Sequence, residues 1–133
     1  MNLRHSLIAL ALAGTASCTV VPPVERNPPA PAGAAVALNQ SVRVGSATVT
    51  PVSVVEDSRC PVNARCVWAG RLVVKTRIEG QADGEVWQDT ADMRLGESFG
   101  THGVVVALVS GEPGRTTDRP TPSGTYRFTY EAR

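Results

Sequence analysis

Two cysteines lie close together in the chain, and cysteine side chains at short spacing can form a disulfide, hold a metal ion or carry redox chemistry. Cys60 and Cys66 lie in the run DSRCPVNARCVWAG, between Asp57 and Trp68. A loop of this length can bring two Cα atoms within the roughly 4.4–6.8 Å that a disulfide requires. We expect a structural disulfide, with Asp57 accepting hydrogen bonds from loop amides and Trp68 covering the sulfur atoms.

A metal site and a redox-active thiol pair are the two alternatives to a structural disulfide. Redox pairs usually have two residues between the cysteines and a helix N-terminus beside them, whereas here five residues intervene and no helix is expected. A zinc site needs about four ligands, and His102, in a Gly-rich turn, is the one histidine outside the leader. We therefore expect no metal ion and no cofactor.

The sequence contains no recognisable set of catalytic residues. Ser58 has no histidine near it in the chain and lies in no Gly-x-Ser-x-Gly elbow. The neighbouring carboxylates Glu56 and Asp57 have no acid–base motif around them and are typical of a capped turn. We therefore predict that the protein is not an enzyme.

The cysteine motif resembles that of a protein family. D-S-R-C-P over residues 57–61, then four residues, then C-x-W-x-G over residues 66–70 is similar to the signature of a group of small bacterial secreted proteins and lipoproteins with β-rich domains. The resemblance covers about residues 40–130, and the motif carries nearly all of it. It implies a β-rich fold and an envelope location, and it implies no biochemical activity.

Residues 1–18 have the pattern of a secretory signal peptide that ends in a lipidation cysteine. Arg4 supplies the positive charge, Leu7 to Ala13 form an apolar stretch too short to span a bilayer, and small residues precede Cys18. The segment resembles bacterial lipoprotein signals, although Thr15 occupies the position where that family prefers leucine.

We expect acyl chains on Cys18 to hold the protein on the membrane at the periplasmic face of the bacterial envelope. In the lipoproteins that this signal resembles, an aspartate after the cysteine retains the protein in the inner membrane; Thr19 there favours the outer membrane. The alternative is ordinary signal-peptidase cleavage near Ala13 or Ala16. Lipidation of Cys18 leaves Cys60 and Cys66 as an even pair in an oxidising compartment.

Behind the leader, we expect a tether and then one domain. Residues 19–35 contain five of the ten prolines, a composition that favours an extended disordered tether. Residues 36–133 are predicted to form a β domain, because apolar residues alternate with polar ones between Gly and Pro punctuation.

Seven short strands are expected, with no helical pattern of ten residues or more. Asp83-Gly84 indicates a hairpin turn, and Pro51 indicates an edge position or a bulge. This spacing predicts an all-β fold, either an antiparallel β-sandwich or a small barrel. The strands are predicted near 42–44, 48–55, 71–78, 85–88, 91–95, 104–109 and 126–130.

Two surfaces are candidates for binding. Arg71, Lys75 and Arg77 alternate with apolar residues, so their side chains should lie in a row on one sheet face; the alternative is a solvated face that protects an edge. The segment from Gly111 to Gly124 is long for a hairpin connection and contains Arg115 and Arg119.

The overall charge excludes one class of function. A formal net charge of +1 with 19% charged residues excludes a polybasic nucleic-acid binder. The leading prediction is a non-enzymatic, lipid-anchored envelope domain that binds a protein or another envelope component. The alternatives are a small-molecule or metal-binding module that uses His102, Met93 and acidic side chains, and, by analogy alone, an inhibitor of an envelope hydrolase such as lysozyme.

Overall fold

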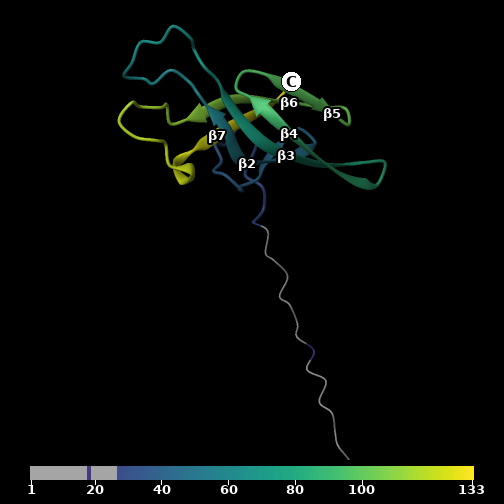
Figure 1. Cartoon of the computed structure of the whole chain (residues 1–133). Helices are drawn as coiled ribbons and strands as arrows, with labels where there is room; N and C mark the ends of the chain where they lie inside the picture. The colour runs from purple at the N-terminus through teal and green to yellow at the C-terminus, as the bar shows by residue number, and fades with distance from the viewer. Residues whose placement is uncertain (1–17, 19–26) are drawn as a thin grey trace, which may run out of the picture.

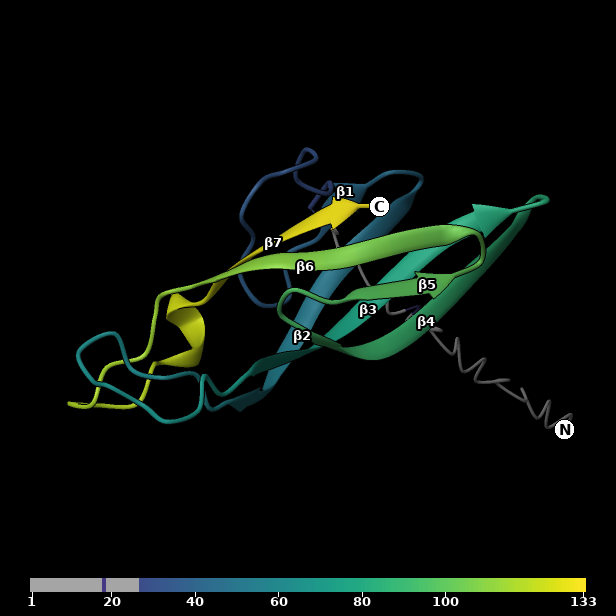
Figure 2. The same ribbon diagram turned by 90° about the horizontal axis from the view of Figure 1, so that it is seen from above.

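Two antiparallel sheets form the domain in the computed structural model, which describes Cys18 and residues 27–133. One sheet has the order β1-β2-β3-β4 and the other the order β5-β6-β7. The two sheets lie face to face, and the described strands do not close into a barrel (Figures 1 and 2). The predicted all-β sandwich is confirmed. The strands are β1 (Val42–Val44), β2 (Ala47–Asp57), β3 (Leu72–Ala82), β4 (Glu85–Arg94), β5 (Ser98–Thr101), β6 (Val104–Glu112) and β7 (Arg127–Ala132).

The core forms between the inner faces of the two sheets. In β3, buried side chains alternate with more exposed ones, as expected for a strand that has one face on the core. The hydroxyl groups of Thr76 in β3 and Tyr130 in β7 lie 3.0 Å apart in a buried hydrogen bond between the sheets. The largest fully buried apolar side chains are Tyr130, Phe128, Leu72, Ile78 and Leu108.

Two strand predictions are corrected. The segments predicted as separate strands at 85–88 and 91–95 form one strand, β4, because β3 pairs with it without interruption from Ala82↔Glu85 to Val73↔Arg94. Strand β5 was not predicted, because its four residues, Ser98–Thr101, include Gly100 and show no alternating apolar pattern. These two differences leave the strand count at seven.

Both turn predictions are confirmed. Asp83 and Gly84 both have positive φ, 52° and 82°, and join β3 to β4, as a two-residue hairpin turn requires. The β2–β3 register shifts between Pro51 and Ser53, which places a bulge beside the proline.

The packed domain includes part of the segment that the sequence assigned to the tether. Ala30 forms a bridge to Val42, and its amide donates to the Ser41 carbonyl at 2.8 Å. Cys18 is an exposed free cysteine. The rest of the predicted signal peptide and residues 19–26 lie outside the described residues. In the described part of the chain, no helix is long and apolar enough to cross a membrane.

Candidate functional site at the disulfide end

Two loops from different sheets lie side by side at one end of the molecule. The disulfide loop, residues 58–71, joins β2 to β3, and the β6–β7 loop, residues 113–126, returns from β6 to β7. Both views show the two loops together, at the end opposite to the β3–β4 hairpin tip (Figures 1 and 2). The β6–β7 loop contains a short 3-10 turn, Ser123–Thr125.

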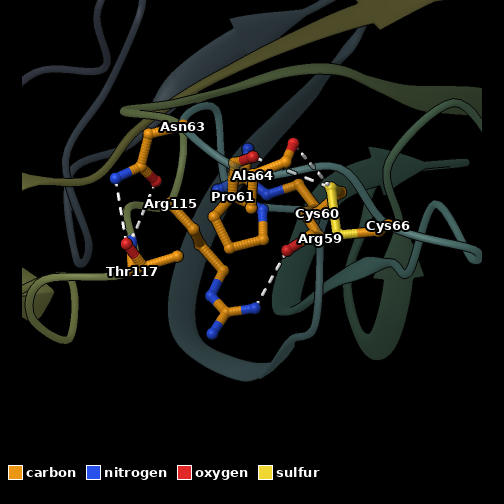
Figure 3. Close-up of a disulfide and its surroundings, with 8 residues drawn as sticks. All are labelled: Arg59, Cys60, Pro61, Asn63, Ala64, Cys66, Arg115 and Thr117. Carbon is orange, nitrogen blue, oxygen red and sulfur yellow. Dashed lines mark hydrogen bonds between the residues drawn. A yellow bond between two sulfur atoms is a disulfide. The ribbon is translucent and has the colours of Figure 1, made fainter.

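Cys60 and Cys66 are joined by a disulfide, with their Cα atoms 5.7 Å apart (Figure 3). The predicted pairing is confirmed. The strand pairing of β2 and β3 continues into the loop, because Ser58 N donates to Arg71 O at 2.8 Å and Cys60 N donates to Ala69 O at 2.9 Å. The disulfide therefore closes a loop whose base is already a hydrogen-bonded ladder.

Gly70 is required where the disulfide loop returns toward β3. Its φ is +67°, a conformation that only glycine adopts without strain. A Cβ atom at this position would lie 1.7 Å from the Ser58 carbonyl oxygen. The last glycine of the C-x-W-x-G pattern therefore permits the close backbone approach that aligns Ser58 with Arg71.

A charged network fixes the base of both loops. The Arg59 guanidinium donates Nε–H and Nη2–H to the two Asp57 carboxylate oxygens, each at 2.8 Å. It also donates to the carbonyl of Gly111 at 2.6 Å and to that of Pro113 at 3.0 Å. The Tyr126 hydroxyl donates to Asp57 at 2.7 Å. Arg59 therefore connects the end of β2 with the start of the β6–β7 loop.

The network shifts the pKa values of its members. Burial alone would raise the pKa of Asp57, but hydrogen bonds from Arg59 and Tyr126 outweigh it, so the pKa is lowered. The pKa of Tyr126 is raised, first by burial and then by its hydrogen bond to the Asp57 carboxylate. Asp57 was expected to accept from loop amides; the backbone of Arg59 contributes a smaller hydrogen bond, and its main partners are these two side chains.

Further contacts hold the two loops against each other (Figure 3). Arg115 donates through Nη1 to the Arg59 carbonyl at 2.9 Å, and Val62 N donates to the Arg115 carbonyl at 2.8 Å. The Asn63 side chain pairs twice with Thr117, donating to its hydroxyl at 2.9 Å and accepting from its amide at 3.0 Å. The loops thus form one connected surface.

Three apolar side chains of the disulfide loop point into solvent. The exposed fractions are 74% for Val62, 92% for Val67 and 82% for Trp68. The expectation that Trp68 covers the disulfide is wrong: residues 66–70 form no strand, so the side chain has no sheet face to lie on. Sequence spacing alone gave no signal for this exposure.

A cavity of about 570 Å³ lies where the β6–β7 loop faces Pro61 of the disulfide loop and Asp57 at the end of β2. It brings together Arg115 and Arg119, the two arginines predicted in the long loop. Sequence reasoning did not find the cavity, because most of its wall is the β6–β7 loop, and the hollow exists only where that loop folds against Asp57 and Pro61, more than fifty positions earlier in the chain. Its lining consists of Asp57, Pro61, Arg115, Thr116, Thr117, Asp118, Arg119, Pro120, Thr121 and Tyr126.

The predicted basic row runs from Arg71, at the base of the disulfide loop, along β3 and away from the cavity, and each of its cations has an acidic neighbour. Arg71 precedes β3 and pairs with Glu56 at 2.7 Å. Arg77 pairs with Glu79 at 3.3 Å, and Lys75 lies opposite Asp92 in the β3–β4 register. The charges of this row are therefore largely compensated on the same sheet.

His102 has an aromatic and an acidic neighbour. Its ring stacks on Trp87 with centroids 4.5 Å apart, and its Nε2 lies 3.5 Å from the Asp89 carboxylate. Met93, the second residue of the metal alternative, is buried in the core. Among residues 27–133 and Cys18, no three His, Cys, Asp or Glu side chains are grouped so that they could hold a metal ion.

Comparison with known proteins adds no relative: no family model, no curated protein and no solved structure matches the chain.

Proposed function

We propose that the chain is a non-enzymatic, lipid-anchored domain of the bacterial envelope that binds a partner protein through its disulfide end. The observation that carries this proposal is the exposure of Trp68, 82%, beside Val62 and Val67 on one loop. Tryptophan is enriched among the residues that dominate the energy of protein interfaces. Exposed apolar clusters with a polar surround are typical of interaction sites.

The bracing of the loop supports the same proposal. A binding loop loses conformational entropy when it is ordered by its partner, and prior order reduces that cost. Here the disulfide, the Arg59 network and the Asn63–Thr117 pair order the backbone around Trp68. The disulfide end therefore presents its apolar side chains from a fixed frame.

Lipidation of Cys18 would anchor this domain to a membrane of the bacterial envelope, on the periplasmic side. The sequence pattern up to Cys18 supports this part of the proposal, and the structure describes Cys18 as exposed and unpaired. Replacing Cys18 with Ala should release the exported protein into the soluble periplasmic fraction. Continued sedimentation of Cys18→Ala with membranes would rule out the acyl anchor.

Site-specific photo-crosslinking in intact cells tests the binding proposal. A photoreactive residue at position 67 should crosslink to one discrete partner protein, because this side chain lies in the proposed interface. Position 86 provides a control, since Val86 is also strongly exposed, 74% against 92% for Val67, but lies at the β3–β4 hairpin. Equal crosslinking at both positions, or none at position 67, would contradict the proposal.

A further inference from the structure

We infer that the cavity between the two loops receives a carboxylate group, so that the partner presents an acidic residue next to an apolar one. This inference rests on the proposed function, because it specifies what the disulfide end recognises. It is carried by the two arginines that line the cavity, Arg115 and Arg119, with Thr116 between them in the chain.

Charge in the cavity favours an anion. Asp57 lies in the lining, but Arg59 and Tyr126 already occupy both of its oxygens. Asp118 then remains as the one acidic group facing two arginines. A carboxylate that enters the cavity therefore meets excess positive charge.

Arg115 is positioned before any ligand arrives. Its Nη1 is held by the Arg59 carbonyl at 2.9 Å, while Nε and Nη2 form no hydrogen bond within the described residues. Figure 3 shows the guanidinium turned away from the Asn63–Thr117 pair, with one nitrogen at the Arg59 carbonyl. A planar guanidinium with two free donors matches a carboxylate, which accepts two parallel hydrogen bonds.

Arg119 is the more adaptable of the two arginines. It is exposed, and it forms no hydrogen bond or ion pair in the part of the chain that the structure describes. Its side chain can therefore close over a bound carboxylate without breaking an existing contact.

The cavity adjoins the apolar surface of the disulfide loop. Pro61 lines the cavity, and the next residue, Val62, is bonded through its amide to the Arg115 carbonyl and exposes its side chain. A partner segment that places a carboxylate between the arginines would therefore bring its neighbouring residue onto the exposed Val62 side chain.

The test is a titration of the full exported chain with succinate, followed by NMR at the backbone amides of residues 115–119 and 121, since Pro120 has no amide proton. Arg119→Gln removes one cation of the cavity, and Arg65→Gln is the matched control, an exposed arginine of the disulfide loop outside the cavity lining. Wild type and Arg65→Gln should show a saturable response, and Arg119→Gln should bind succinate about tenfold more weakly, as expected for a lost charge-assisted hydrogen bond.

Two further probes check the chemical class. Succinamide, which has the same length without charge, should give no saturable response. Inorganic phosphate should bind more weakly than succinate. An absent response to succinate, equal responses to succinate and succinamide, tighter binding of phosphate, or an unchanged affinity in Arg119→Gln would each overturn the inference.

The crosslink at position 67 separates this inference from the proposed function. Both stand if the crosslink weakens in Arg119→Gln and persists in Arg65→Gln. If the crosslink persists undiminished in Arg119→Gln, the result supports the proposed interface and contradicts the proposed carboxylate contact. If succinate binds but position 67 gives no crosslink, the proposed function falls, and with it the assignment of the carboxylate to a protein partner.

Discussion

At the scale of single residues, the structure of the disulfide end depends on a few positions at which a substitution should destabilise the fold. Arg59 compensates the charge of Asp57 and donates to two carbonyls of the other sheet, that of Gly111 at the end of β6 and that of Pro113 in the β6–β7 loop. The Asp57 side chain is only 8% exposed, so removing one partner would leave the other charge poorly compensated. Gly70 occupies a position at which a side chain has no space.

Gly70→Ala should destabilise the protein strongly, because the new Cβ collides with the Ser58 carbonyl and the backbone is strained as well. Gly84→Ala is the matched control: its φ is also positive, +82°, but no atom lies within 4 Å of the added Cβ. The control should cost about 1 kcal/mol of the free energy of unfolding. Thermal unfolding should show a clearly larger drop for Gly70→Ala, and equal drops would contradict the role given to Gly70.

Asp57→Asn should make stability less dependent on acid pH. Because the pKa of Asp57 is lower in the folded protein than in the unfolded chain, its charge stabilises the fold above about pH 4. That contribution disappears as the pH falls through the folded-state pKa. Wild type should therefore exceed Asp57→Asn by about 2 kcal/mol in the free energy of unfolding at neutral pH, and the difference should shrink below about pH 4.

Denaturant unfolding between pH 2 and 7 measures this difference. Glu56→Gln is a useful comparison, because Glu56 also has a lowered pKa, first through its hydrogen bond from Ser58 and then through that from Arg71, but its side chain is 35% exposed, against 8% for Asp57. It should show a smaller pH-dependent effect. A difference between wild type and Asp57→Asn that stays constant with pH would contradict the proposed charge network.

At the scale of elements, the two hairpin regions of the sandwich differ in how they are stabilised. The β3–β4 hairpin ends in the Asp83-Gly84 turn, and Trp87 lies against Gly80 of the facing strand, where a Cβ would approach its ring to 2.4 Å. The other face of this tryptophan stacks on His102 of the β5–β6 turn. The disulfide loop is held mainly by covalent and polar contacts, and of its exposed apolar side chains Val62 lies against Gly114 of the β6–β7 loop.

Replacing Cys60 and Cys66 together with Ser should lower the melting temperature by roughly 10 °C. Without the disulfide, the unfolded chain regains conformational freedom, which lowers the free energy of unfolding by about 2 kcal/mol for a short loop. Each kcal/mol corresponds to several degrees in the melting temperature of a domain of this size. Cys18→Ser is the control and should melt with the wild type, because Cys18 is exposed and unpaired. An unchanged melting temperature in the double variant would contradict a stabilising role for the disulfide.

The elements that were predictable are those whose signal is local. The alternation in β3, the Asp-Gly turn and the spacing of the two cysteines each depend on a few adjacent residues. The union of 85–88 with 91–95 into β4 was not predictable, because the length of the facing strand decides it. The contacts between the two loops were not predictable for the same reason. Arg59 and Gly111 are hydrogen-bonded across 52 positions, and every residue has a backbone carbonyl, so the sequence does not indicate which one accepts the bond.

At the scale of the whole molecule, the domain has two unlike ends. The β3–β4 hairpin forms one end, and the two connected loops with their cavity form the other (Figure 2). The sandwich between them keeps its core away from both, so changes at the loop tips should alter binding before they alter folding. The formal net charge of +1 offers little long-range steering, which leaves recognition to the local surface.

The most direct test of binding through the disulfide end is the crosslinking yield from a photoreactive residue at position 62, measured in cells with Trp68 and with Trp68→Ala. Loss of a central interface tryptophan typically costs about 2 kcal/mol or more of binding free energy, so the yield should fall by about tenfold or more. Val86→Ala truncates another exposed apolar side chain, 74% exposed against 82% for Trp68, at the other end of the domain and should leave the yield unchanged. The same yield with Trp68 and with Trp68→Ala would contradict binding through this surface.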